Sequence, residues 1–154
     1  MTTATPAQVR ASISSYIAAH VTYADSSGVS QALKTFADGE TVPSPPCAVV
    51  LPASGQYLNY QVVMGGQLAG WDGRFRILIL VSKGDVKSGT VQLDGFLSPH
   101  GSPSTSIVQA LLADPTCGGA ADYEMPIEAS WSGSGEWAGQ EYMTGQILIE
   151  AAAE

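Results

Sequence analysis

Hydrophobic and polar positions near the start of the chain alternate with the period of an α-helix. Thr5 can cap such a helix, Pro6 fits its first turn, and Gln8 can complete a capping box. One stripe at helical spacing is apolar: Val9, Ile13, Tyr16, Ile17 and Val21. The pattern therefore predicts a helix that starts after Thr5 and packs one side against a core.

The pattern changes over the next thirty or so positions. Residues 30–38 carry a weaker helical pattern, with Leu33 and Phe36 on one side, and this predicts a second helix. The segment TVPSPPC, residues 41–47, cannot be helical because its three prolines fix an extended or turning backbone. A short apolar strand over residues 48–51 is predicted to follow it.

The middle of the chain predicts two strands joined by a long connection. Residues 57–64 alternate between apolar and polar positions, as in a half-buried strand. The glycine-rich segment GGQLAGWDG, residues 65–73, exceeds the usual hairpin length, which predicts a projecting arm or a binding loop. In residues 74–81 the alternation of Arg74 and Arg76 with apolar residues gives way to the run ILILV, which is typical of a strand covered on both faces.

The second half of the chain predicts two helices and then two strands. An apolar stripe predicts a helix over residues 85–97, and Ser102 is expected to cap a shorter helix. Alternating patterns predict strands over residues 123–131 and 141–149, joined by the turn SGSGE. Pro126 lacks an N–H group, so its strand is expected to lie at a sheet edge or to contain a bulge there.

The order of these elements predicts the fold class. A helix, two or three strands, helices and two final strands indicate an α+β fold with a mostly antiparallel sheet of four to five strands and helices packed on one face. A length of 154 residues suits a single domain, residues 1–154, in which residues 24–44 form a connection or insert. Because the start of the chain is polar and no long apolar run follows, we expect no secretion signal and no membrane span.

Charge narrows the classes of function. Only 13% of residues are charged, against about 25% in an ordinary soluble domain. Subunit interfaces are depleted of Lys, Glu and Asp, so this composition favours a surface largely covered by neighbours. The chain has fourteen acidic and six basic residues, for a net charge of −8. Six dispersed cations do not form a basic patch that binds nucleic acid.

The sequence offers no candidate catalytic, cofactor-binding or metal-binding residues. Cys47 and Cys117 lack metal-ligand spacing and are expected to be buried free thiols in a reducing compartment. GSGEWA, residues 133–138, fits a dinucleotide fingerprint only formally, because it joins two strands and is expected to form a hairpin turn. His100 lies among Pro, Gly and Ser without an accompanying nucleophile pattern, as in a solvated turn. We therefore expect no enzymatic activity.

The predicted arm contains one large aromatic residue, Trp71. Aromatic residues often anchor interfaces, but they also fill cores, and the sequence leaves both roles open for Trp71. Together with Leu68, Arg74 and Arg76, it forms the candidate assembly interface.

Several segments in series resemble a known family. They are PPCAVVLPAS, GRFRILILVSKGD and VQLDGFLSPHGSPSTSIVQALLADPTCGG, followed by a closing hairpin rich in aromatic residues and glycine. Over about residues 45–150 this series is similar to the tail terminator proteins of long-tailed bacteriophages, particularly those of actinobacterial phages. The shared motifs are structural and contain no catalytic residues.

The resemblance implies a structural virion protein without a cofactor. Such a protein forms a ring, usually sixfold, that caps the head-proximal end of the tail tube and stops its polymerisation. Its expected partners are further copies of itself, the major tail tube protein and the head connector or stopper protein. It would be assembled in the host cytoplasm and reside in the neck region of the virion, with no membrane contact.

DNA would pass through the lumen of such a ring without binding to it. An acidic inner wall repels the phosphate backbone and lets the duplex slide. Four acids on or beside the final hairpin are the candidates for that wall: Glu124, Glu128, Glu136 and Glu141.

Two alternatives remain open at this stage. Another neck component, such as a head-completion or stopper protein, would share the size and the ring symmetry. A small α+β binding or hydrolytic domain is the more distant alternative, and it would need a concave polar pocket with perturbed titratable groups.

Overall fold

The chain has an α+β fold, as the sequence predicted. The computed structural model describes residues 4–25, 27–37, 44–82, 86–119, 121–137 and 139–153. In chain order the elements are α1 (Pro6–His20), β1 (Thr22–Ala24), β2 (Ser30–Ala32), β3 (Lys34–Phe36), β4 (Cys47–Pro52), β5 (Leu58–Val62), β6 (Leu68–Val81), α2 (Val86–Leu97), α3 (Ile107–Ala113), β7 (Tyr123–Trp137) and β8 (Gln140–Ala153). The predicted helix start at Asp85 lies outside the described residues.

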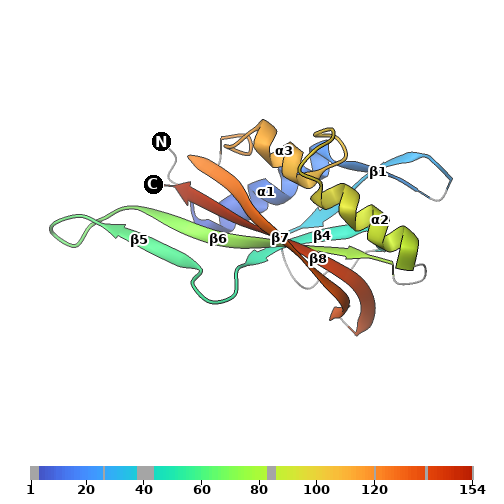
Figure 1. Cartoon of the computed structure of the whole chain (residues 1–154). Coiled ribbons are helices and arrows are strands. Elements are labelled where there is room, and N and C mark those ends of the chain that lie inside the picture. The colour runs from blue at the N-terminus through green and yellow to red at the C-terminus, as the bar shows by residue number, and fades with distance from the viewer. Residues whose placement is uncertain are drawn as a thin grey trace.

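The main sheet has six strands, not four to five. Its order is β3-β4-β6-β8-β7, and β5 pairs with the outer part of β6 (Figure 1). The pairings are antiparallel except for β3 with β4, which is parallel. β1 and β2 form a separate two-stranded antiparallel ribbon. Three strands lie where the sequence patterns did not indicate one: β1, and the neighbouring β2 and β3.

The prediction of a helix over residues 30–38 is wrong. Ser30–Ala32 pairs with β1, and Lys34–Phe36 pairs with β4. Between them Leu33 is fully buried, and its N–H donates to the Val21 carbonyl at 3.0 Å. Neighbouring backbones satisfy the polar groups of this segment, so pairing outweighs its weak helical pattern. The end of the predicted helix, at residue 38, lies outside the described residues.

Helix α1 confirms the N-terminal prediction. The Thr5 hydroxyl accepts a hydrogen bond from the Gln8 N–H at 3.2 Å, and the Gln8 side chain accepts one from the Thr5 N–H at 2.8 Å. This reciprocal capping box satisfies two N–H groups at the start of the helix. Val9, Ile13 and Ile17 are buried, so the predicted stripe does face the core.

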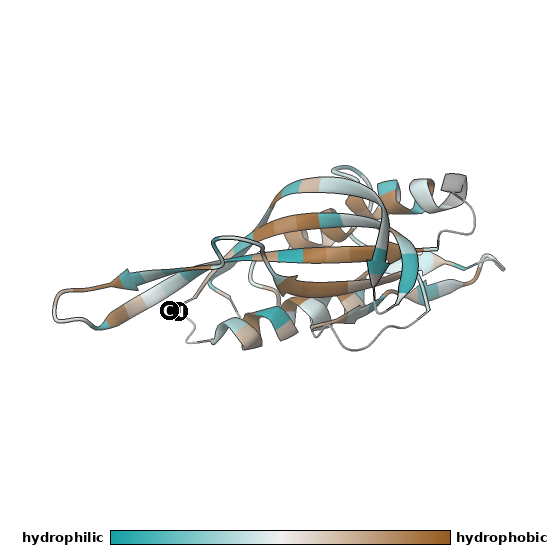
Figure 2. Cartoon of the chain, turned by 90° about the horizontal axis from the view of Figure 1, so that it is seen from below, coloured by the Kyte–Doolittle hydropathy of each residue, from teal (hydrophilic) through white to brown (hydrophobic). Residues whose placement is uncertain are grey.

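The central position of β6 explains its unbroken apolar run. β6 lies between β4 and β8, and its odd-numbered residues Phe75, Ile77 and Ile79 are fully buried. They belong to one large apolar cluster that also contains residues of α1, α2, α3, β4 and β8. On the other face Leu80 packs in a smaller cluster with Tyr142. Figure 2 shows the apolar residues running along these central strands.

The C-terminal half corrects two predicted boundaries. α3 starts at Ile107 with Ser106 as its cap, while Ser102 accepts the Ser106 N–H in the preceding turn. The segment SGSGE does not form the turn between the final strands, because β7 continues to Trp137. Gly135 lies opposite Tyr142 there, and a Cβ on it would meet the Thr144 side chain at 3.0 Å. The glycine thus permits close packing within a strand.

Pro126 occupies the position that its missing N–H predicted. Its strand, β7, lies at one edge of the sheet, and a bulge separates Pro126 from Glu128. Cys47 and Cys117 are both buried and free, as expected from their spacing.

Candidate assembly surfaces

The segment expected to be a loop over residues 65–73 is mostly a strand. Residues 68–73 form the start of β6 and pair with β5, which makes a long hairpin. The turn closes where the Val63 N–H donates to the Gln67 carbonyl at 2.8 Å. Small residues hid this alternation in the sequence, because glycine and alanine carry little hydrophobic signal. We call residues 58–70 the arm; it projects from one end of the molecule (Figure 1).

The arm exposes apolar side chains and carries no charge. No Asp, Glu, Lys or Arg occurs between Leu58 and Trp71. Met64, at the tip, is 100% exposed. The large apolar side chains exposed on the arm are Tyr60, Val62, Val63, Met64 and Leu68. Exposed apolar side chains gathered on a protruding hairpin are typical of a contact site.

The four candidate interface residues do not form one patch. Leu68 lies on the arm and is 64% exposed. Arg74 pairs with Glu150 at 3.1 Å on the sheet. Arg76 is only partly exposed, and its Nε has no hydrogen-bond partner among the described residues.

Trp71 belongs to the core of its own chain. It is 9% exposed, its ring meets Phe75 edge-on, and its indole N–H donates to the Ala4 carbonyl at 3.0 Å. A Cβ on Gly73 would come within 2.6 Å of this indole, so the glycine makes room for the ring. Of the two roles that the sequence left open, the structure supports the core role.

The four candidate lumen acids differ in exposure. Glu128, Glu136 and Glu141 are exposed on the long β7–β8 hairpin, and Glu136 lies directly opposite Glu141. Glu124 is 3% exposed, so its proposed place on an inner wall is wrong. The register explains the difference, because Glu124 pairs with buried Ala151 on the face that carries the main core.

Glu124 lies in a partly buried cluster of titratable groups that the sequence did not reveal. The other members are Tyr16 on α1 and two residues of the loop after α3, Asp114 and Cys117. Neither carboxylate oxygen of Glu124 has a well-formed hydrogen bond within the described part of the chain. Burial raises the pKa of Glu124 to about 8, the Cys117 thiol acts in the opposite direction, and the Asp114 carboxylate adds to the rise.

The geometry of this cluster does not activate its thiol. Cys117 has a left-handed backbone, with φ of 48°, in a loop held by hydrogen bonds from Thr116 and Gly118 to the Asp114 carboxylate. Burial raises the pKa of the Cys117 thiol, and the nearby acids raise it further. A thiol with a raised pKa stays protonated at neutral pH and is a poor nucleophile.

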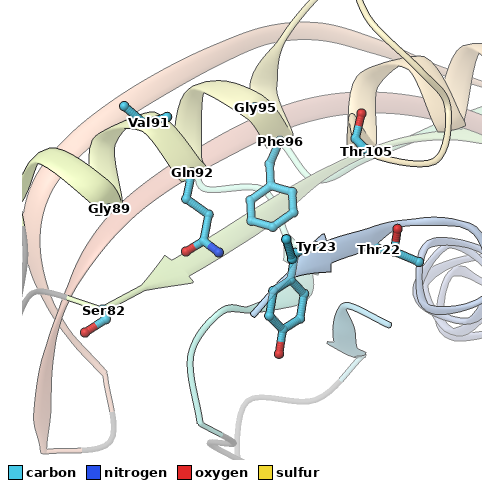
Figure 3. Close-up of a pocket in the computed structure, with 10 residues that line it drawn as sticks. Thr22, Tyr23, Ser82, Gly89, Val91, Gln92, Gly95, Phe96 and Thr105 are labelled. Carbon is cyan, nitrogen blue, oxygen red and sulfur yellow. The ribbon is translucent and has the colours of Figure 1, made fainter. Parts of the chain in front are cut away.

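The structure also contains a groove that the sequence did not predict. It lies between α2 and β1, has a volume of about 720 Å³, and is lined in part by Tyr23 and Phe96 (Figure 3). Its described lining residues are all uncharged: Thr22, Tyr23, Ala24, Ser82, Gly89, Val91, Gln92, Gly95, Phe96 and Thr105. These residues come from four separate segments, so no local motif could indicate the groove.

Neither a metal-ligand group among the described residues nor a similar known protein indicates the function of the chain. Within the described ranges, no three His, Cys, Asp or Glu residues are grouped to hold a metal ion. None of the described helices combines the length and the apolar character needed to cross a membrane. A scan against protein-family models gives no match, and a search of curated proteins gives none either.

Proposed function

We propose that this chain is a tail terminator of a long-tailed bacteriophage. In this role it forms a ring, sixfold in symmetry, at the head-proximal end of the tail tube in the virion neck. The ring stops tube polymerisation and gives the head connector a surface to bind. The proposal starts from the sequence resemblance, and the surface of the fold supports it.

The observation that carries the proposal is where the exposed apolar residues lie. Most of the large ones in the described part of the chain occur on two hairpins, the arm and the β7–β8 hairpin. On β7 they are Tyr123, Met125, Ile127 and Trp131. A subunit with few charges, an apolar arm and an edge strand that exposes apolar side chains is suited to contacts on more than one side, as a ring between two partners requires.

The proposal also gives each face of the sheet a role. The helices pack on one face, where they close the main core. The opposite face and edge strand β7 are left for neighbouring subunits, which would shield Leu78 and the exposed Tyr123. This division accounts for a central strand that is apolar on both sides in a chain too short to cover both faces by itself.

A mixture of the purified protein with the matching tail tube protein tests the proposal. We expect electron microscopy to show a ring of roughly 95 kDa, six times 15.9 kDa, at one end of each tube, and tubes that stop growing. Unchanged tube growth with bare ends would overturn the terminator role. Rings that bind the head connector but ignore the tube would identify a stopper protein instead. In a terminator, the gene should also lie just before the major tail tube gene.

The acidic hairpin leads to a prediction about DNA passage. Glu128→Lys and Glu136→Lys should each leave the free energy of unfolding within about 0.5 kcal/mol, because both side chains are exposed. Each should slow DNA delivery, because a lysine in the lumen attracts the phosphate backbone, and added salt should relieve the defect. The measurement is the rate of DNA ejection from particles that carry the variant, at several salt concentrations.

Asp94→Lys is the matched control for these variants. Asp94 is an exposed acid on α2, outside the β7–β8 hairpin, and its reversal changes the net charge by the same amount. Ejection from this control should match that of wild type. Equal slowing of DNA ejection in all three variants would show that the effect comes from net charge alone. A ring with a net positive lumen would refute the proposal of an acidic inner wall.

A further inference from the structure

We propose that the tip of the arm of one subunit inserts into the groove between α2 and β1 of the next subunit. The partner is thus a second copy of this chain, bound head to tail. The inference deepens the proposed function by supplying the subunit contact of its ring, and the closure of that ring rests on the proposed function.

The arm and the groove lie at opposite ends of the molecule. In Figures 1 and 2 the arm projects from one end of the molecule, while α2 and β1 lie toward the other end. An arm cannot reach the groove of its own chain in this arrangement. Two different surfaces at opposite ends produce a heterologous contact, which repeats from copy to copy and closes into a ring when the rotation allows.

The tip of the arm and the lining of the groove are chemically complementary. The arm carries no charged residue, and its tip ends in Val62, Val63 and the fully exposed Met64. The described lining of the groove is also free of charge, and the exposed Val91 and the partly exposed Tyr23 contribute to it (Figure 3). An unbranched thioether adapts to irregular apolar cavities and packs favourably against aromatic rings. Insertion would therefore remove apolar surface from water on both partners.

The groove is of a size that suits the tip of the arm. A groove of about 720 Å³ lies within the range of pockets that enclose a compact ligand. It has room for several side chains of the tip but not for a whole helix or domain. The narrow end of a two-stranded hairpin is an occupant of suitable width, and the turn at residues 63–67 is such an end.

The uncharged character of the described lining residues disfavours other classes of occupant. An acidic or basic peptide, or a nucleic acid, would find no counter-charge among the described residues of the groove. A second copy is always present during assembly at a matching concentration, and it brings an uncharged tip. The tail tube protein is the alternative receiver of the tip, and the effects of Met64→Lys on capping and on self-association distinguish it from a second copy.

Cysteine cross-linking tests the contact directly. Met64→Cys places a thiol at the tip, and Gly95→Cys places one in the groove, where an added Cβ meets nothing within 4 Å. Both native cysteines are buried and should not compete. After brief oxidation of the double variant, we expect a ladder of covalent multimers on a non-reducing gel. Each single variant should give no species beyond a dimer.

The matched control pairs Met64→Cys with Leu112→Cys. Leu112 is 51% exposed on α3 and does not line the groove. This pair should give no ladder. A ladder of equal yield in the control, or none in the Met64–Gly95 pair, would overturn the proposal.

A charge exchange gives a second and reversible test. Met64→Lys and Gly95→Glu should each weaken self-association at least tenfold by burying an unpaired charge, and the double variant should regain most of it. Sedimentation velocity measures association, and circular dichroism checks that each variant is folded. Unchanged association in both single variants would contradict the arm–groove contact.

The outcomes also separate this inference from the proposed function. A cross-linked ring that fails to cap tail tubes would leave the arm–groove contact standing and remove the terminator role. Capped tubes without Met64–Gly95 cross-links would do the reverse. If Met64→Lys abolishes capping while self-association is unchanged, the tip binds the tube protein and the inference is wrong.

Discussion

Replacing Trp71 by alanine should lower the free energy of unfolding by about 4 kcal/mol, as truncation of a buried aromatic side chain usually does. The indole is 9% exposed, meets Phe75 edge-on and donates its N–H to the Ala4 carbonyl. The substitution therefore opens a cavity above Gly73 and also releases the chain before α1. Chemical denaturation monitored by circular dichroism measures the loss.

Two further variants show whether packing or the hydrogen bond dominates. Trp71→Phe keeps most of the ring but loses the N–H donor, so its cost should fall well below that of alanine. Tyr60→Ala is the matched control, because Tyr60 lies directly opposite Trp71 on β5 but is 60% exposed. It should change the free energy of unfolding by no more than about 0.5 kcal/mol. Equal losses in Trp71→Ala and Tyr60→Ala would contradict a core role for Trp71.

The parts of the fold that could be predicted are those with a strong local pattern. α1 has a capping box and an apolar stripe within sixteen residues of one another, and both are present in the structure. β6 shows its central position through the run ILILV, because only a strand covered on both faces needs apolar residues in succession. The edge position of β7 followed from one missing N–H group, at Pro126.

The parts that failed depend on partners far along the chain. Lys34–Phe36 is a strand because β4 accepts it in parallel, and nothing within residues 30–38 indicates that partner. Residues 68–73 are a strand because β5 pairs with them, although glycine and alanine blur their alternation. The glycines near Trp131 resemble a turn, yet they serve bulges and close packing within β7.

The candidate sites were harder to predict than the fold. Trp71 lies in a glycine-rich segment, which is typical of a loop. In the structure Gly73 makes room for the Trp71 ring, so the glycine has a packing role. A glycine two residues from an aromatic residue was therefore the one signal in the sequence for a buried ring. Glu124 alternates correctly for the outward face of an isolated strand. A bulge between Pro126 and Glu128 shifts the register, so Glu124 lies on the core face, and the loop after α3 packs there, with the Glu124 N–H donating to the Pro115 carbonyl. The groove arises only when α2 and β1 meet in three dimensions.

The buried carboxyl of Glu124 should make the protein less stable as the pH rises. Its pKa is about 8 in the folded chain, against an ordinary value of 4.5, because burial disfavours the charged form. The folded state thus holds a proton that the unfolded chain releases. The stabilising contribution is complete below pH 4.5 and is lost as the pH rises to about 8, a loss on the order of 4 kcal/mol.

Other members of the cluster titrate outside this window. Hydrogen bonds from Thr116 and Gly118 lower the pKa of Asp114 below its ordinary 3.8, so its contribution is lost only in more acidic solution. The raised pKa values of Cys117 and Tyr16 lie above their ordinary 9.0 and 10.0. The slope between pH 5 and 8 therefore reports on Glu124 among these four groups.

Glu124→Gln isolates that slope, because the amide has a similar shape and stays neutral at every pH. The free energy of unfolding, measured by denaturant titration from pH 5 to 8, should fall steeply in wild type and much less in the variant. The variant should then exceed wild type in stability at pH 8, since unfolding no longer relieves a buried charge. Glu128→Gln, at an exposed site on the same strand, should keep the wild-type slope. Parallel pH profiles for wild type and Glu124→Gln would show that the carboxyl reaches water in the folded protein.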